Sequence, residues 1–141
     1  MSAYARNQQL AAYHSVAAHG GVAQDDPHRL VLMLMDGAQQ RIHAARGSLQ
    51  RGERAQKAQM LQRALAIIDE LRASLDLQRG GALASNLGDL YDYMGRQLIR
   101  ANVEDRVACL DEVLALLAEI RGAWVAIAPD AGRAPPAARA G

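Results

Sequence analysis

The residues that could catalyse a reaction or bind a metal are few in this sequence, and they form no pattern typical of either chemistry. The four histidines are His14, His19, His28 and His43, and none belongs to a Glu-x-x-His or His-Glu-x-x-His motif. Two precede the first predicted helix, one lies at its start and one on its polar face, so we expect all four to be solvated. Cys109 is the only cysteine, and one thiol cannot form a zinc-binding cluster.

Motifs for nucleophilic catalysis and phosphate binding are also missing. No serine lies in a Gly-x-Ser-x-Gly elbow, and the pairs Gly20-Gly21 and Gly80-Gly81 lack the lysine and hydroxyl residues of a phosphate-binding loop. Asp89 and Asp92 have the spacing of a solvated helix face. We therefore predict a protein that is not an enzyme and that requires no metal or cofactor.

Nucleic-acid binding is a second function class that the sequence disfavours. Four basic residues lie around the start of the second predicted helix, namely Arg51, Arg54, Lys57 and Arg63. The Gly80-Gly81 turn has the outline of a helix-turn-helix, but Asp89 and Asp92 would lie on its recognition helix. Because 16 basic and 15 acidic residues leave a formal charge of only +1, attraction to phosphates is weak.

The composition of the 141 residues indicates one helical, globular domain. Apolar residues make up 50% and charged residues 22%, while phenylalanine and threonine, which favour strands, are absent. No apolar run approaches the ~18 residues of a membrane span, and the N-terminus lacks the apolar centre of a signal peptide. A single cysteine allows no disulfide framework within the chain. We therefore expect a cytoplasmic protein.

Hydrophobic periodicity predicts the helices that must position any binding surface. The first begins at Asp26-Pro27, because aspartate can cap a helix and proline suits its first position, and it runs to about Gln50. Its apolar stripe is Val31, Leu34, Ala38, Ile42, Ala45 and Leu49. The second helix covers about residues 53–77 and is ended by Gly80-Gly81. Its stripe is Leu61, Ala64, Leu65, Ile68, Leu71 and Leu75.

Two further helices follow. The third covers about residues 83–101, or a shorter span if Ser85 caps it, with Leu83, Leu87, Leu90, Tyr91, Met94 and Leu98 on one face. The fourth runs from a cap at Asn102 to about Ala128, with Leu110, Val113, Leu117, Ile120 and Trp124 on one face. Short connections make neighbouring helices antiparallel, so the predicted fold is all-α, an up-down-up-down four-helix bundle over residues 25–128. We predict a mobile N-terminal arm over residues 1–24 and a disordered tail, rich in alanine, proline and arginine, over residues 129–141.

The four helices carry more apolar residues than their stripes require. Those that flank the stripes are Leu32, Met33, Ile67, Tyr93, Ile99 and Leu116. One interpretation is a wide core with residues at its edges. The other is a set of apolar grooves that receive an amphipathic segment of another protein.

Three blocks of the sequence resemble the FliS-type flagellar secretion chaperones. They are DPHRLVLMLMDGA in the first helix, ALAIIDELRASLDLQRGGALASNLGDLYDYMGRQLIRAN over residues 64–102, and CLDEVLALLAEIRGAW over residues 109–124. The resemblance spans about residues 13–127. The chain departs from the family pattern at Met35, Gly95 and Gly122, where an aromatic, a basic and a polar residue are common.

The resemblance implies a cytoplasmic chaperone that binds the disordered C-terminal segment of flagellin and prevents premature polymerisation. It also implies delivery to the flagellar type III export apparatus, by docking on an export gate protein, with no nucleic-acid partner and no membrane insertion. The chaperone would be a monomer or weak homodimer. The alternative is a helical adaptor or regulatory domain that binds another disordered protein.

The candidate flagellin-binding residues combine the surplus apolar residues with neighbours on the third helix and in the arm. They are Tyr13, Val16, Leu32, Met33, Ile67, Leu87, Tyr91, Tyr93, Met94, Ile99 and Leu116. We expect Tyr13 and Val16 of the arm to cover an apolar groove in the empty chaperone, because tyrosine buries a ring while its hydroxyl stays wet. We expect Trp124 to pack in the core or in a groove.

Overall fold

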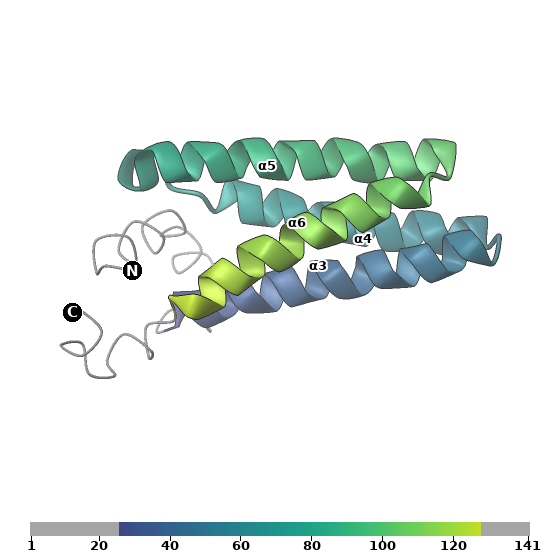
Figure 1. The fold of residues 1–141 in the computed structure, drawn as a ribbon, viewed down its shortest axis with the longest axis horizontal. Helices are drawn as coiled ribbons and strands as arrows, with labels where there is room; N and C mark the ends of the chain where they lie inside the picture. The colour runs from purple at the N-terminus through teal and green to yellow at the C-terminus, as the bar shows by residue number, and fades with distance from the viewer. Residues whose placement is uncertain (1–25, 128–141) are drawn as a thin grey trace.

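The computed structural model describes residues 26–127, which form four α-helices (Figure 1). These are α3 (Pro27–Gln50), α4 (Arg54–Ala73), α5 (Leu77–Glu104) and α6 (Val107–Ala126). They alternate in direction along the bundle, as the short connections require. The all-α, up-down-up-down prediction is therefore confirmed. The predicted arm and tail lie outside the described residues.

The helices form a closed ring of neighbours around one core. Helix α3 packs against α4 and α6, and α5 packs against the same two helices from the other side. The contact between α3 and α4 is the most extensive. Figure 1 shows α6 crossing the bundle obliquely, from the end of α5 toward the N-terminal end of α3. This path brings the last turn of α6 beside the first turn of α3.

The first helix begins and ends where the sequence predicts. The Asp26 carboxylate accepts a hydrogen bond from the backbone N–H of Arg29 at 2.9 Å, and Pro27 occupies the first turn. The helix ends at Gln50, and Gly52 then adopts a positive φ of 75° in the turn to α4. Glycine takes this conformation without the steric cost that other residues pay.

His28 is buried, which makes the expectation that all four histidines are solvated wrong. Its ring stacks on the Trp124 indole with centroids 4.6 Å apart, and its Nε2 donates to the Trp124 carbonyl oxygen at 2.6 Å. The Trp124 Nε1 donates in return to the His28 carbonyl oxygen at 2.9 Å. A carbonyl can only accept, so Nε2 carries the proton. The pair joins the start of α3 to the end of α6.

The boundary between the second and third helices differs from the prediction. Helix α4 ends at Ala73, and the Asp76 carboxylate caps α5 by accepting from the backbone N–H of Arg79 at 3.0 Å. The glycine pair does mark a break, since Gly81 has non-helical backbone angles of φ 54° and ψ −132°, but the break separates the first turn of α5 from the rest of that helix rather than α4 from α5. Ser85 lies within the helix and caps nothing. The cap at Asp76 therefore starts the helix about one turn before the glycine pair.

The third helix also continues further than its stripe indicates. It reaches Glu104, and Asp105 follows in the left-handed region at φ 54°. The prediction that Asn102 caps the next helix is wrong, since α6 begins at Val107 after Arg106 and has no side-chain cap. The Lys57 ammonium instead donates to the Asn102 carbonyl oxygen at 3.0 Å. A cation here satisfies one of the unpaired carbonyls at the end of a helix.

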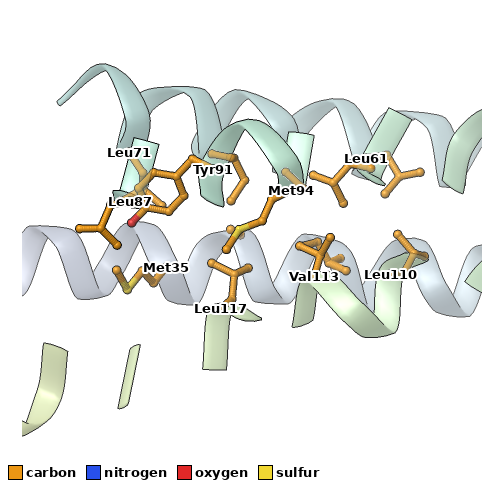
Figure 2. Close-up of a cluster of buried hydrophobic side chains, with 14 of the residues drawn as sticks. Met35, Leu61, Leu71, Leu87, Tyr91, Met94, Leu110, Val113 and Leu117 are labelled. Carbon is orange, nitrogen blue, oxygen red and sulfur yellow. The ribbon is translucent and has the colours of Figure 1, made fainter. Parts of the chain in front are cut away.

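The core follows the predicted stripes closely (Figure 2). The stripe residues that are fully buried are Val31, Ala38, Ile42, Ala45, Leu61, Ala64, Ile68, Leu71, Leu87, Tyr91, Met94, Leu98, Leu110, Val113, Leu117 and Trp124. The remaining stripe residues are half-buried at its edges. Met35 is fully buried although it lies off the predicted stripe. Within the described residues, no helix is both long enough and apolar enough to span a bilayer.

Candidate functional site

Three of the candidate binding residues belong to the core. Leu87, Tyr91 and Met94 point from α5 into the space between the helices, where Figure 2 shows them beside Met35 and Leu117. A partner on the surface of this structure cannot contact them. All three lie on the apolar stripe predicted for this helix, and that spacing is the signal for their burial.

The other described candidates lie at the surface but do not form one patch. Met33 is 57% exposed and Ile99 is 54% exposed. The half-buried candidates are Leu32, Ile67, Tyr93 and Leu116. Ile67 lies where α3 and α4 meet, beside Gly37. Ile99 lies where α4 and α5 meet, and Tyr93 lies where α5 and α6 meet, hydrogen-bonded to Glu112. Tyr13 and Val16 lie outside the described residues.

A groove between α4 and α5 is lined by one of the surface candidates, Ile99. Its volume is about 210 Å³, and its lining residues are Leu61, Gln62, Leu65, Leu98, Ile99 and Asn102. The floor is apolar, because Leu61 and Leu98 are almost completely buried. The amides of Gln62 and Asn102 give the groove a polar part that can hydrogen-bond to a partner.

The groove is bounded by specific contacts at its two ends. At one end α4 and α5 approach closely, since a Cβ at Gly95 would lie 3.3 Å from Leu65 Cδ1. At the other end Lys57, itself buried, donates to the Asn102 carbonyl oxygen and forms an ion pair with Asp105. The hydrogen bond from Lys57 lowers the pKa of the Asp105 carboxyl below its usual range. These contacts fix the spacing of the two helices along the groove.

Exposed apolar surface continues beyond the groove. Val103 lies one helical turn after Ile99 on α5 and is 77% exposed. Residues four apart lie on the same side of a helix, so Ile99 and Val103 form a short apolar ridge beside the hollow. Val103 is not among the residues predicted from the sequence, although its spacing of four from Ile99 signals a shared helix side. A ridge beside an apolar hollow is the surface that an amphipathic helix recognises.

A polar cluster joins α5 to α6 on another side of the bundle. The Tyr93 hydroxyl donates to the Glu112 carboxylate, whose oxygens lie 2.7 and 2.8 Å away, and Gln97 Nε2 donates to the same group at 2.8 Å. The hydrogen bond to Glu112 raises the pKa of Tyr93 above its usual range. The Arg96 guanidinium lies 5.9 Å from the centre of the Tyr93 ring. Tyr93 is thus held in place by its neighbours.

Residues 26–127 offer no site for metal chemistry. No group of three or more histidine, cysteine or acidic side chains converges in this part of the chain. Cys109 is buried in the core. The described surface does present the α4–α5 groove and its ridge, and an apolar hollow of this kind suits a protein partner.

Comparison with known proteins gives the family. The model of the family described as flagellar protein FliS matches residues 8–131. The chain is 41% identical to the flagellar secretion chaperone FliS of Salmonella typhimurium, over 86% of this chain and 91% of that protein. It is 41% identical to the flagellar secretion chaperone FliSB of Pseudomonas aeruginosa, over 79% of this chain and 89% of that protein. The Escherichia coli chaperone is 35% identical over 80% of this chain and 84% of its own length. The chain therefore belongs to the FliS family of flagellar secretion chaperones.

Proposed function

We propose that this protein is a cytoplasmic chaperone for flagellin that binds the disordered C-terminal segment of the subunit before export. Family membership supports a chaperone role in flagellar export. The observation that carries the binding proposal is the α4–α5 groove with Ile99 and Val103 beside it. A chaperone for an export substrate must cover apolar surface on its cargo, and this groove offers matching apolar surface.

The dimensions of the groove define how cargo would bind. A volume of about 210 Å³ accommodates one large apolar side chain and part of a second, rather than a whole helix. We expect an amphipathic segment of flagellin to lie along α5 as a helix, with one apolar residue in the hollow and the next against the ridge. The amides of Gln62 and Asn102 would then hydrogen-bond at the edge.

Reversible binding follows from the same arrangement. Ordering a disordered segment costs free energy that offsets part of the contact energy, so the affinity stays moderate for the area buried. Binding would keep the C-terminal segment from assembling with other flagellin subunits. The loaded chaperone would then dock on an export gate protein, release flagellin and return, without contact with nucleic acid or insertion into the membrane.

The arm is the proposed competitor for this site. Tyr13 and Val16 are large apolar residues that precede the first helix. Gly20-Gly21 lies between them and the helix, and glycine gives the backbone the freedom to turn back toward the bundle. We infer that the arm covers apolar surface in the empty chaperone and that flagellin displaces it. The same cover would keep the empty chaperone a monomer or a weak homodimer.

A pair of substitutions tests the groove. Ile99→Glu places a charge at the mouth of the hollow and should weaken binding of a flagellin C-terminal peptide at least tenfold in calorimetric titration. Val125→Glu is the matched control, because Val125 is also apolar and exposed, at 42%, but lies on α6 near the other end of the bundle. Equal affinities of the two variants for the flagellin peptide would show that the groove is not part of the flagellin-binding site. A chaperone that binds no flagellin peptide at all would favour the alternative, an adaptor for another disordered protein.

A further inference from the structure

The outer face along which α3 and α4 meet carries arginines beside apolar side chains. Gly37 of α3 lies against α4, since a Cβ on it would be 3.4 Å from Ile67 Cδ1. The same position is 4.0 Å from Nη1 of Arg41, so this guanidinium lies along α3 close to Ile67. Met33, one turn before Gly37, is a large apolar side chain of α3 that is 57% exposed.

The antiparallel arrangement of the two helices adds a second cation. With Gly37 opposite Ile67, Arg41 is opposite Arg63, which lies one turn before Ile67 and is exposed. We call Met33, Gly37, Arg41, Arg63 and Ile67 the arginine face.

Neither arginine of this face has an ion-pair or hydrogen-bond partner within residues 26–127. The contrast with the opposite side of α3 is clear. There Arg46 binds Asp111 at 2.7 Å and Arg121 binds Asp36 at 2.5 Å, each with a second contact to the same carboxylate. The bundle therefore neutralises the arginines where α3 meets α6.

We propose that the arginine face binds an amphipathic helix of a second protein, one that carries carboxylates beside its apolar stripe. Apolar residues of that helix would pack against Met33 and Ile67, and its carboxylates would pair with Arg41 and Arg63. An arginine and a carboxylate can form two parallel hydrogen bonds, which makes such pairs strong and directional. This site goes beyond the proposed flagellin site, because it lies on α3 and α4 rather than in the α4–α5 groove.

The charge of the face favours a helix over a membrane or a nucleic acid. Glu70 lies one turn after Ile67 on α4, toward the Met33 end, so the face is acidic at one end and basic at the other. Two arginines with one nearby glutamate supply too few phosphate contacts for either alternative. This arrangement is matched by a partner helix whose carboxylates all lie at one end, where they face Arg41 and Arg63. The two sites would let the chaperone hold its cargo and a second protein together.

Designed peptides test this proposal without the natural partner. The probe is a labelled 18-residue helical peptide with leucines on one stripe and glutamates beside it, and the comparison peptide has lysines in place of the glutamates. We expect the glutamate peptide to bind the full chain and to shift backbone amide resonances of residues 33–41 and 63–70. Arg41→Glu/Arg63→Glu should weaken this binding at least tenfold by fluorescence anisotropy and should improve binding of the lysine peptide.

A matched control separates this face from general charge. Arg54→Glu/Arg96→Glu makes the same change in net charge on exposed residues outside the face, and should leave the affinity for the glutamate peptide within twofold. Circular dichroism verifies that both double variants are folded. Equal binding of the two peptides, an equal loss in the control, or resonance shifts confined to the α4–α5 groove would each overturn the proposal.

The proposals for the flagellin site and for the arginine face can be contradicted independently of each other. Arg41→Glu/Arg63→Glu should bind the flagellin C-terminal peptide like the unmodified chain, while Ile99→Glu should bind the glutamate peptide normally. A tenfold loss of flagellin binding in the arginine variant would show that this face belongs to the cargo site, and would overturn the assignment of a second partner.

Discussion

At the scale of single residues, the most specific structure in the bundle is the pair formed by His28 and Trp124. Each side chain donates to the other residue's backbone carbonyl, and the rings stack at an interplanar angle of 9°. A buried histidine and a buried indole both need hydrogen-bond partners, and here each supplies the other. The sequence places Trp124 on the apolar stripe of the last helix. It does not reveal His28 as its partner, because the two are 96 residues apart.

Replacing Trp124 should therefore be costly. Trp124→Ala removes a large, fully buried side chain and leaves the His28 carbonyl without its donor, so we expect a loss of about 3–5 kcal/mol in the free energy of unfolding. Urea titration of both proteins measures the difference. His43→Ala, at an exposed position on the same helix as His28, should change stability by less than about 0.5 kcal/mol. A loss below about 1 kcal/mol for Trp124→Ala would contradict the packing described.

At the scale of the helices, Gly81 tests the kink in α5, and Gly122 of α6 serves as the comparison because its backbone is helical. Gly81 has φ 54° and ψ −132°, a combination that residues with a Cβ avoid, so Gly81→Ala should destabilise the bundle by more than about 1 kcal/mol. Gly122 lies within α6 with open space around it, so Gly122→Ala should stabilise it by about 0.4–1 kcal/mol. Thermal unfolding gives the two signs. A stabilising Gly81→Ala would mean that α5 runs straight through this position.

The turn between α5 and α6 gives a prediction about pH. The folded protein lowers the pKa of Asp105 through its hydrogen bond with Lys57, so the charged carboxylate favours folding. This contribution is present above the ordinary aspartate pKa of about 3.9 and disappears as the pH falls through the lowered value.

Asp105→Asn isolates this charge effect, because asparagine tolerates the left-handed backbone at φ 54°. The difference in unfolding free energy between the two proteins should be largest near pH 7 and should shrink below about pH 4. Denaturant titrations at several pH values measure it. A difference that stays constant over this range would show that Lys57 makes no favourable ion pair with Asp105.

At the scale of the whole molecule, periodicity was sufficient for the fold and insufficient for the site. The spacing of residues such as Ile42 and Leu117 predicts that they are buried, because an α-helix repeats every 3.6 residues. Lys57 has no such signal. It is buried because the end of α5 offers it a carbonyl and a carboxylate, which only the packed bundle brings together. The α4–α5 groove likewise depends on how two helices are spaced, so the sequence names Ile99 but not the hollow beside it.

The arm should affect affinity if it competes with cargo. Deleting residues 1–20 should raise the affinity for a flagellin C-terminal peptide and increase self-association, since an intramolecular cover is removed. Calorimetry and sedimentation measure the two effects. A weaker complex would show instead that the arm contacts flagellin directly, and an unchanged affinity would show that it takes no part.

The central claim of the chaperone proposal is that this protein recognises the C-terminal segment of flagellin. Calorimetric titration of the full chain with intact monomeric flagellin, and then with flagellin lacking its C-terminal segment, tests this most directly. We predict a one-to-one complex with the intact subunit and no measurable binding once the segment is removed. Equal affinity for the two forms of flagellin, or no binding to either, would contradict the proposed function.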